Sequence, residues 1–139
     1  MARREARLSF SVRIVPAPGQ SEATWRRLLH EWEAHADEHA LALEGTQLLW
    51  QVSALDRGLT EGDQVDLLDW LVDRPPVREV QMSALHERGD AVAQLEAGFV
   101  CLRCGDPCTA SLTLLYRNRR LTASMYLQVL GGYMRPALR

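Results

Sequence analysis

The sequence contains no lysine, so that all 16 of its basic residues are arginine, an absence that we attribute to GC-rich coding. Three cysteines in 139 residues are few and odd in number, which argues against a framework of disulfide bonds. No apolar run is long enough to cross a bilayer, and the N-terminal MARREAR leads into a predicted strand without the apolar segment of a signal peptide. We therefore expect a cytoplasmic protein that has no membrane partner.

Motifs that usually support catalysis are also missing. The sequence has no Ser-His-Asp grouping, no glycine-rich loop that could cradle a phosphate, and no evident pair of buried carboxylates. The predicted sheet lacks the exposed aromatic pairs on which RNA-recognition sheets stack bases. We therefore predict a protein that is not an enzyme, has no small-molecule substrate or required cofactor, and does not read single-stranded RNA by its sequence.

Four segments have the composition and alternation typical of strands. They are residues 8–15, 41–45, 46–54 and 77–83. In the first of them, the side chains expected to face the core are Leu8, Phe10, Val12 and Ile14. The second and third are separated by a turn at Glu44 and Gly45, which predicts a hairpin.

Two helices are expected between these strands. Ser21 is a suitable N-cap for the first, which we expect to continue to about His39. Thr60 is a suitable N-cap for the second, where Asp63 stands three residues further on, as in a capping box. Pro75 ends this helix.

The order strand-helix-strand-strand-helix-strand predicts an α+β protein of the ferredoxin-like class, with two helices on one face of a four-stranded antiparallel sheet. The opposite face would be open. We divide the chain into a basic N-terminal arm (residues 1–7), a core domain (8–89) and a C-terminal extension (90–139). In the extension we expect a short helix and a strand, then a second strand, a basic turn at residues 117–120, and another strand or short helix. This β-rich extension would pack on the core, covering the open face, or mediate a homodimer.

Charge is unevenly distributed along the chain. Residues 1–27 hold six arginines and two acids, residues 28–95 hold four arginines and fourteen acids, and residues 96–139 hold six arginines and two acids. Basic ends suit contacts with phosphate, because the guanidinium fork binds phosphate oxygens in pairs and releases counterions from a nucleic acid. Alternatively, the basic ends fold back on the acidic middle. The candidate RNA-binding residues are Arg3, Arg4, Arg7, Arg13, Arg117, Arg119 and Arg120.

An acidic stripe is expected along the second helix, opposite its apolar face. Its members are Asp63, Asp66, Asp69 and Asp73. Such a stripe is usually a solvated helix face. The functional alternative is a surface that docks a basic protein, or that imitates the charge of a nucleic acid in order to occupy another protein's binding site.

Two groups of residues have the spacing of metal ligands. Cys101, Cys104 and Cys108 form CxxCGxxC, which is similar to a zinc knuckle, although structural zinc usually needs four ligands and the thiols could simply be buried, lie in a loop or form a redox pair. His35, Glu38 and His39 match the HxxEH motif of inverzincin metalloproteases. Because no third ligand on a later helix is evident, we interpret these histidines as structural or exposed to solvent.

Several short motifs follow one another in residues 8–85. They are FSV at 10–12, PGQSE at 18–22, LALEG at 41–45, LTE at 59–61, WL at 70–71 and VREVQMSALHE at 77–87. Their order and spacing resemble the YggL family of 50S-ribosome-binding proteins. The resemblance implies a small protein that associates with the large ribosomal subunit and has no established enzyme activity.

The leading hypothesis is therefore a ribosome-associated protein that uses its basic arm, an arginine on the open sheet face and the 117–120 turn against ribosomal RNA. A protein–protein interaction module or inhibitor, presenting the acidic helix to a basic partner, is the first alternative. A small zinc-stabilised domain is the second.

Overall fold

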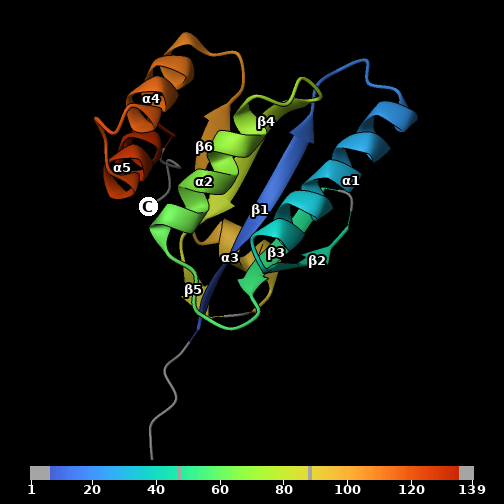
Figure 1. The fold of residues 1–139 in the computed structure, drawn as a ribbon, viewed down its shortest axis with the longest axis horizontal. Coiled ribbons are helices and arrows are strands. Elements are labelled where there is room, and N and C mark those ends of the chain that lie inside the picture. The colour runs from blue at the N-terminus through green and yellow to red at the C-terminus, as the bar shows by residue number, and fades with distance from the viewer. Residues whose placement is uncertain (1–6, 47, 88, 135–139) are drawn as a thin grey trace, which may run out of the picture.

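The computed structural model describes residues 7–46, 48–87 and 89–134, which form an α+β fold with an open antiparallel sheet (Figure 1). The predicted RNA-binding residues Arg3 and Arg4 lie outside this described part. Its elements are β1 (Leu8–Pro16), α1 (Glu22–Glu38), β2 (Leu41–Gly45), β3 (Leu49–Ala54), α2 (Glu61–Val72), β4 (Val77–Ser83), β5 (His86–Glu87), α3 (Ala91–Glu96), β6 (Phe99–Arg103), α4 (Pro107–Arg117) and α5 (Ala123–Met134).

The sheet has six strands in the described part of the chain, not the four that we expected. Five of them lie in the order β2-β3-β1-β4-β6, and the two-residue β5 pairs with the start of β1. All neighbouring strands are antiparallel; for example, Val12 in the central β1 lies opposite Trp50 in β3 and Met82 in β4. The two additional strands come from residues that follow β4. Strand β6 extends the sheet beyond β4, and β5 pairs with the first residues of β1.

The two helices between the strands begin where their capping residues predicted. The Oγ of Ser21 accepts a hydrogen bond from the backbone N–H of Thr24. At the start of α2, Thr60 and Asp63 form a complete capping box, in which each side chain accepts from the other residue's backbone N–H. These caps satisfy backbone donors that the first turn of a helix leaves without partners.

The apolar core lies between the sheet and the helices α1 and α2, which cover one face (Figure 1). From β1, Phe10, Val12 and Ile14 are fully buried there, and α1 contributes the fully buried Trp32. The prediction that Leu8 is part of this core is wrong, because its side chain is 37 % exposed. It lies at the beginning of β1, where the sheet partner is only the short β5.

The prediction that the C-terminal extension is β-rich is wrong. Its described residues, 90–134, contain one strand, β6, and three helices, α3, α4 and α5. Asp106 caps α4 and Pro107 occupies its first turn, while Thr109 and Thr113, one turn apart, are buried on the same side of the helix. The helix α5 packs against α2 and β6, and its Tyr126 is fully buried in the same core as the first part of the chain.

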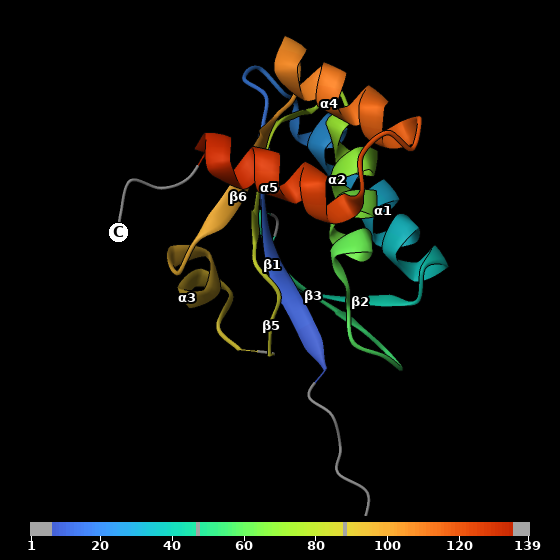
Figure 2. The same cartoon turned by 90° about the vertical axis from the view of Figure 1, so that its left-hand side faces the viewer.

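The face of the sheet opposite α1 and α2, here called the far face, is partly covered by α3 (Figure 2). This contact is polar: Oε1 of Gln94 accepts hydrogen bonds from Oγ of Ser11 and from Nε2 of Gln51, and all three residues are buried. The expectation of an open far face is therefore wrong for the part of the sheet that α3 covers. Within the described residues, none of the helices combines the length and apolar character needed to cross a membrane.

Candidate functional site

Arg117, at the end of α4, lies against the acidic stripe of α2. Its Nε donates to Oδ1 of Asp69 at 2.5 Å, and its Nη2 donates to Oδ2 of Asp73 at 2.6 Å. The neighbouring Tyr116 donates its hydroxyl to Asp66 at 3.1 Å. Residues from the two predicted binding surfaces thus pair with each other, as in the alternative in which the basic ends fold back on the acidic middle.

These contacts change the protonation properties of the groups that make them. Hydrogen bonds from Arg117, first to Asp73 and then to Asp69, raise the pKa of its guanidinium and keep it charged. Burial, followed by the negative charge of Asp66, raises the pKa of Tyr116 to about 12, so that its hydroxyl is a donor at physiological pH.

The remaining residue of the acidic stripe, Asp63, is held by groups at the start of α2. Arg57 binds both of its carboxylate oxygens, at 2.8 and 2.9 Å, and Thr60 donates to it from the backbone and from the hydroxyl. Burial alone would raise the pKa of Asp63, but the hydrogen bonds from Arg57 and Thr60 outweigh it and lower the pKa. All four aspartates of the stripe therefore have partners within the chain.

The turn after α4 exposes the other two arginines of the predicted basic turn. Arg119 has φ 61°, and its backbone N–H donates to the carbonyl of Tyr116, while that of Arg120 donates to the carbonyl of Leu115. This is the Schellman arrangement, in which the left-handed position after the helix is usually glycine. Both arginine side chains are exposed. Both arginines line a pocket of about 550 Å³. The other residues that line it are Asp69, Tyr116, Arg117, Leu121, Thr122 and Met125.

Arg13 does not belong to this pocket. It lies on the far face, half-buried, where its Nη1 donates to Oε1 of Gln81 at 3.4 Å. Arg7 is exposed near the start of β1, and its Nη1 donates to the backbone carbonyl of Leu55. The predicted RNA-binding arginines in the described part of the chain are therefore spread over different faces of the molecule.

The three cysteines are not brought together as a group of metal ligands among the described residues. Cys101 is buried in β6 on the far face, Cys104 donates its thiol to the carbonyl of Leu71 on the helix-covered side, and Cys108 is exposed in the first turn of α4. Burial, and then the carboxylate of Glu79, raises the pKa of Cys101 to about 12. Burial likewise raises the pKa of Cys104 to about 11, so both are protonated at neutral pH.

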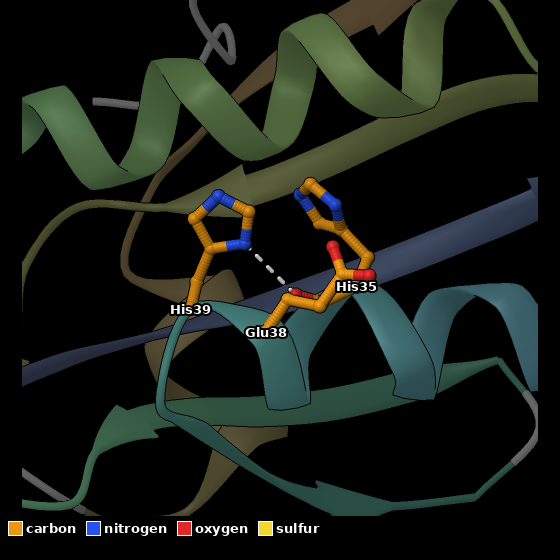
Figure 3. A group of neighbouring side chains, drawn as sticks. All are labelled: His35, Glu38 and His39. Carbon is orange, nitrogen blue, oxygen red and sulfur yellow. Dashed lines mark hydrogen bonds between the residues drawn. The ribbon is translucent and has the colours of Figure 1, made fainter.

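The HxxEH residues, by contrast, do come together (Figure 3). One potential ligand atom from each of His35, Glu38 and His39 lies within 4.8 Å of the others, at the C-terminal end of α1. The ring of His35 stacks on Trp70 of α2, with centroids 4.8 Å apart and planes at 18°. On that indole, the guanidinium of Arg74 lies 4.1 Å from the ring centroid.

The environment of His35 lowers the pKa of its ring. Burial is the largest cause, followed by the neighbouring His39; Arg74 acts in the same direction, while Glu38 and Asp66 oppose it. Sequence reasoning missed the contribution of Trp70, because a stacking contact between two helices leaves no pattern along the chain. Arg74 follows the C-cap of α2, and its Nε donates to the backbone carbonyl of Trp70 at 3.0 Å.

No family model matches the chain, and neither curated proteins nor solved structures gave a match. The resemblance to the YggL family therefore stays a prediction.

Proposed function

We propose that the chain is a non-enzymatic cytoplasmic protein that binds the 50S ribosomal subunit through exposed arginines, with Arg119 and Arg120 at the centre of the contact. The observation that carries this proposal is the conformation of Arg119. A left-handed backbone costs an L-residue roughly 1–2 kcal/mol, and glycine avoids this cost at the same position. A long cation kept at such a position, exposed beside a second arginine, supports a role in binding.

Phosphate is the ligand that this turn would suit. Arg119 and Arg120 are consecutive residues that both line a pocket, and each guanidinium can bind phosphate oxygens in pairs; the pocket is also lined by Tyr116. Arg117 contributes less, because Asp69 and Asp73 already bind its guanidinium. We further propose that Arg7 and the N-terminal arm, including Arg3 and Arg4, add contacts of the same kind, and that Arg13 acts on the far face.

The alternative of an acidic docking helix receives less support. Each of its four aspartates accepts a hydrogen bond from another side chain of this chain, and a basic partner would first have to displace Arg117 and Arg57. For the same reason, imitation of nucleic-acid charge by α2 is the weaker proposal.

Cosedimentation of the full-length chain with purified 50S subunits, at a series of salt concentrations, tests the proposal. We expect binding at low salt that weakens steeply as salt rises, because each arginine–phosphate contact releases counterions. The double variant Arg119→Ala/Arg120→Ala should bind more weakly, with a salt slope reduced by roughly 1 for each arginine. The matched control, Arg27→Ala/Arg78→Ala, removes two exposed arginines elsewhere and should bind as the wild type does.

Two results would overturn this proposal. One is absence of the wild-type chain from the 50S fraction at low salt. The other is equal binding by the two double variants, since that would make the contact a property of net charge alone.

We also propose that β1–β4, with α1 and α2, form a ferredoxin-like unit to which β5, β6 and the later helices are added. The antiparallel order β2-β3-β1-β4 and the position of both helices over one face support this interpretation. Proton–proton contacts in solution between β1 and both β3 and β4 test it, and their absence from either pair would contradict it.

A further inference from the structure

We propose that His35, Glu38 and His39 form a binding site for one divalent transition-metal ion of the zinc class, at the C-terminal end of α1. The three side chains project from one side of the helix (Figure 3), and the ligand atom of each lies within 4.8 Å of the other two. Two imidazole nitrogens and a carboxylate oxygen are a donor set that zinc accepts, with one position left for water or another ligand.

The spacing of these residues explains why they meet. Residues three and four apart lie next to each other on a helix surface, so His35 and His39 face the same direction, and their ring centroids are 4.4 Å apart. A tetrahedral zinc ion holds its ligand atoms roughly 3.3 Å from one another. Closing the cluster therefore needs the ligand atoms to approach one another by up to roughly 1.5 Å. Side-chain rotations can supply this movement because Glu38 and His39 are exposed.

The hydrogen bonding of His39 prepares it to be a ligand. Its Nδ1 lies 2.9 Å from the backbone carbonyl oxygen of His35. Because that oxygen can only accept, Nδ1 is the nitrogen that carries the proton in the neutral ring, and the lone pair of Nε2 is left for a metal ion. An orienting bond from the other ring nitrogen to a carbonyl is common for histidines that bind metals.

The electrostatic surroundings also favour a cation. The last turn of a helix is the negative end of the helix dipole, and His39 is the C-cap of α1. The carboxylates of Glu38 and Asp66 add negative charge around His35, whereas Arg74 opposes a cation. The stack on Trp70 restricts the His35 ring and so reduces the entropy that is lost on binding.

Zinc titration of the tag-free, full-length chain by calorimetry is the test. The cysteine thiolates compete for zinc, so all proteins carry Cys108→Ser, which removes the exposed thiol. We expect one zinc ion per chain. His39→Asn, which keeps a polar residue at the helix C-cap, and Glu38→Gln should each weaken binding at least about tenfold. The matched control is His30→Ala, an exposed histidine on the same helix outside the cluster, which should leave the affinity unchanged.

A spectroscopic readout separates this site from other zinc ligands. Paramagnetic Ni²⁺ should broaden the NMR signals of residues 35–39 and of the Trp70 indole, which stacks on His35, before those of His30 or His86. Absence of saturable one-to-one binding would overturn the proposal. So would equal losses of affinity in the His39→Asn and His30→Ala variants, or Ni²⁺ broadening centred elsewhere in the chain.

Discussion

Gln94 on α3 and Ser11 on β1 are joined by a buried hydrogen bond of 2.5 Å, although 83 residues separate them in the sequence. The same amide oxygen accepts from Gln51 at 2.8 Å, and the amide nitrogen of Gln94 donates to the carbonyl of Glu87 at 2.9 Å. One side chain thus connects α3 to the three strands β1, β3 and β5. These bonds allow serine and glutamine side chains to be buried on the far face, because each has a partner.

Replacing Gln94 by leucine should destabilise the protein by about 1–3 kcal/mol, because the substitution leaves buried polar groups of Ser11 and Gln51 without their acceptor. Urea denaturation followed by circular dichroism measures this loss. The control is Gln128→Leu, at an exposed position of α5, where we expect a change within about 0.5 kcal/mol. Equal stability of the two variants would contradict the role assigned to Gln94.

The contact of Arg117 with α2 leads to a prediction that depends on salt. In Arg117→Gln, the carboxylates of Asp69 and Asp73, four residues apart on one helix, lose their shared cation and repel each other. Because these groups are partly exposed, we expect a loss of about 1 kcal/mol in the free energy of unfolding at low salt. This loss should shrink at high salt, where the repulsion is screened.

Urea denaturation at two ionic strengths measures the effect of Arg117→Gln. The exposed Arg27→Gln serves as the control that removes one arginine elsewhere. A loss that is the same at both ionic strengths would show that the packing of Arg117, and not its charge, stabilises α4 on α2.

The first half of the fold could be predicted because local signals agree with one another there. Alternation in β1 and caps at Ser21 and Thr60 indicate the same boundaries that the tertiary structure adopts. In α4 they conflict: the alternating LTLLY segment is typical of a strand, whereas the cap formed by Asp106 and Pro107 favours a helix. Packing against α5 favours the helix, because it places the hydroxyl of Thr113 2.9 Å from the hydroxyl of Tyr126.

The sequence predicts which charged residues belong to the candidate site but not how their side chains are arranged in space. The sequence shows which segments are basic and which are acidic, and it allows the two to meet. It does not show that Arg117 reaches Asp69 across 48 residues while Arg119, two positions later, stays exposed. The Schellman turn begins after Arg117, so that Arg117 is the last residue of α4 beside α2, whereas Arg119 belongs to the turn that follows.

The end of α1 offers a test of backbone strain that is free of charge effects. Ala40, which follows the C-cap, has φ 56°, a left-handed conformation that glycine adopts without a steric cost. We expect Ala40→Gly to stabilise the protein by about 0.5–1 kcal/mol. Ala34→Gly, at an exposed position within the same helix, should instead destabilise it by about 1 kcal/mol. Thermal denaturation compares the two, and a change of the same sign in both would contradict the strain at Ala40.

The pKa of Asp63 predicts how stability depends on pH. Hydrogen bonds from Arg57 and Thr60 outweigh burial and lower this pKa from its ordinary value of 3.8 in the folded protein. Because the folded-state pKa is lower than the unfolded-state pKa, the ionised Asp63 carboxylate stabilises the folded protein. This stabilisation is fully present at pH values above the unfolded-state pKa. It is lost as the pH falls through 3.8 toward the folded-state pKa.

Asp63→Asn should therefore reduce stability at neutral pH and make the acid side of the stability profile less steep. Urea midpoints measured from neutral to acidic pH test this, with the exposed Asp37→Asn on α1 as the control. If the urea midpoint of both variants depends on acidic pH as steeply as that of the wild type, ionisation of Asp63 does not contribute to the pH dependence of stability.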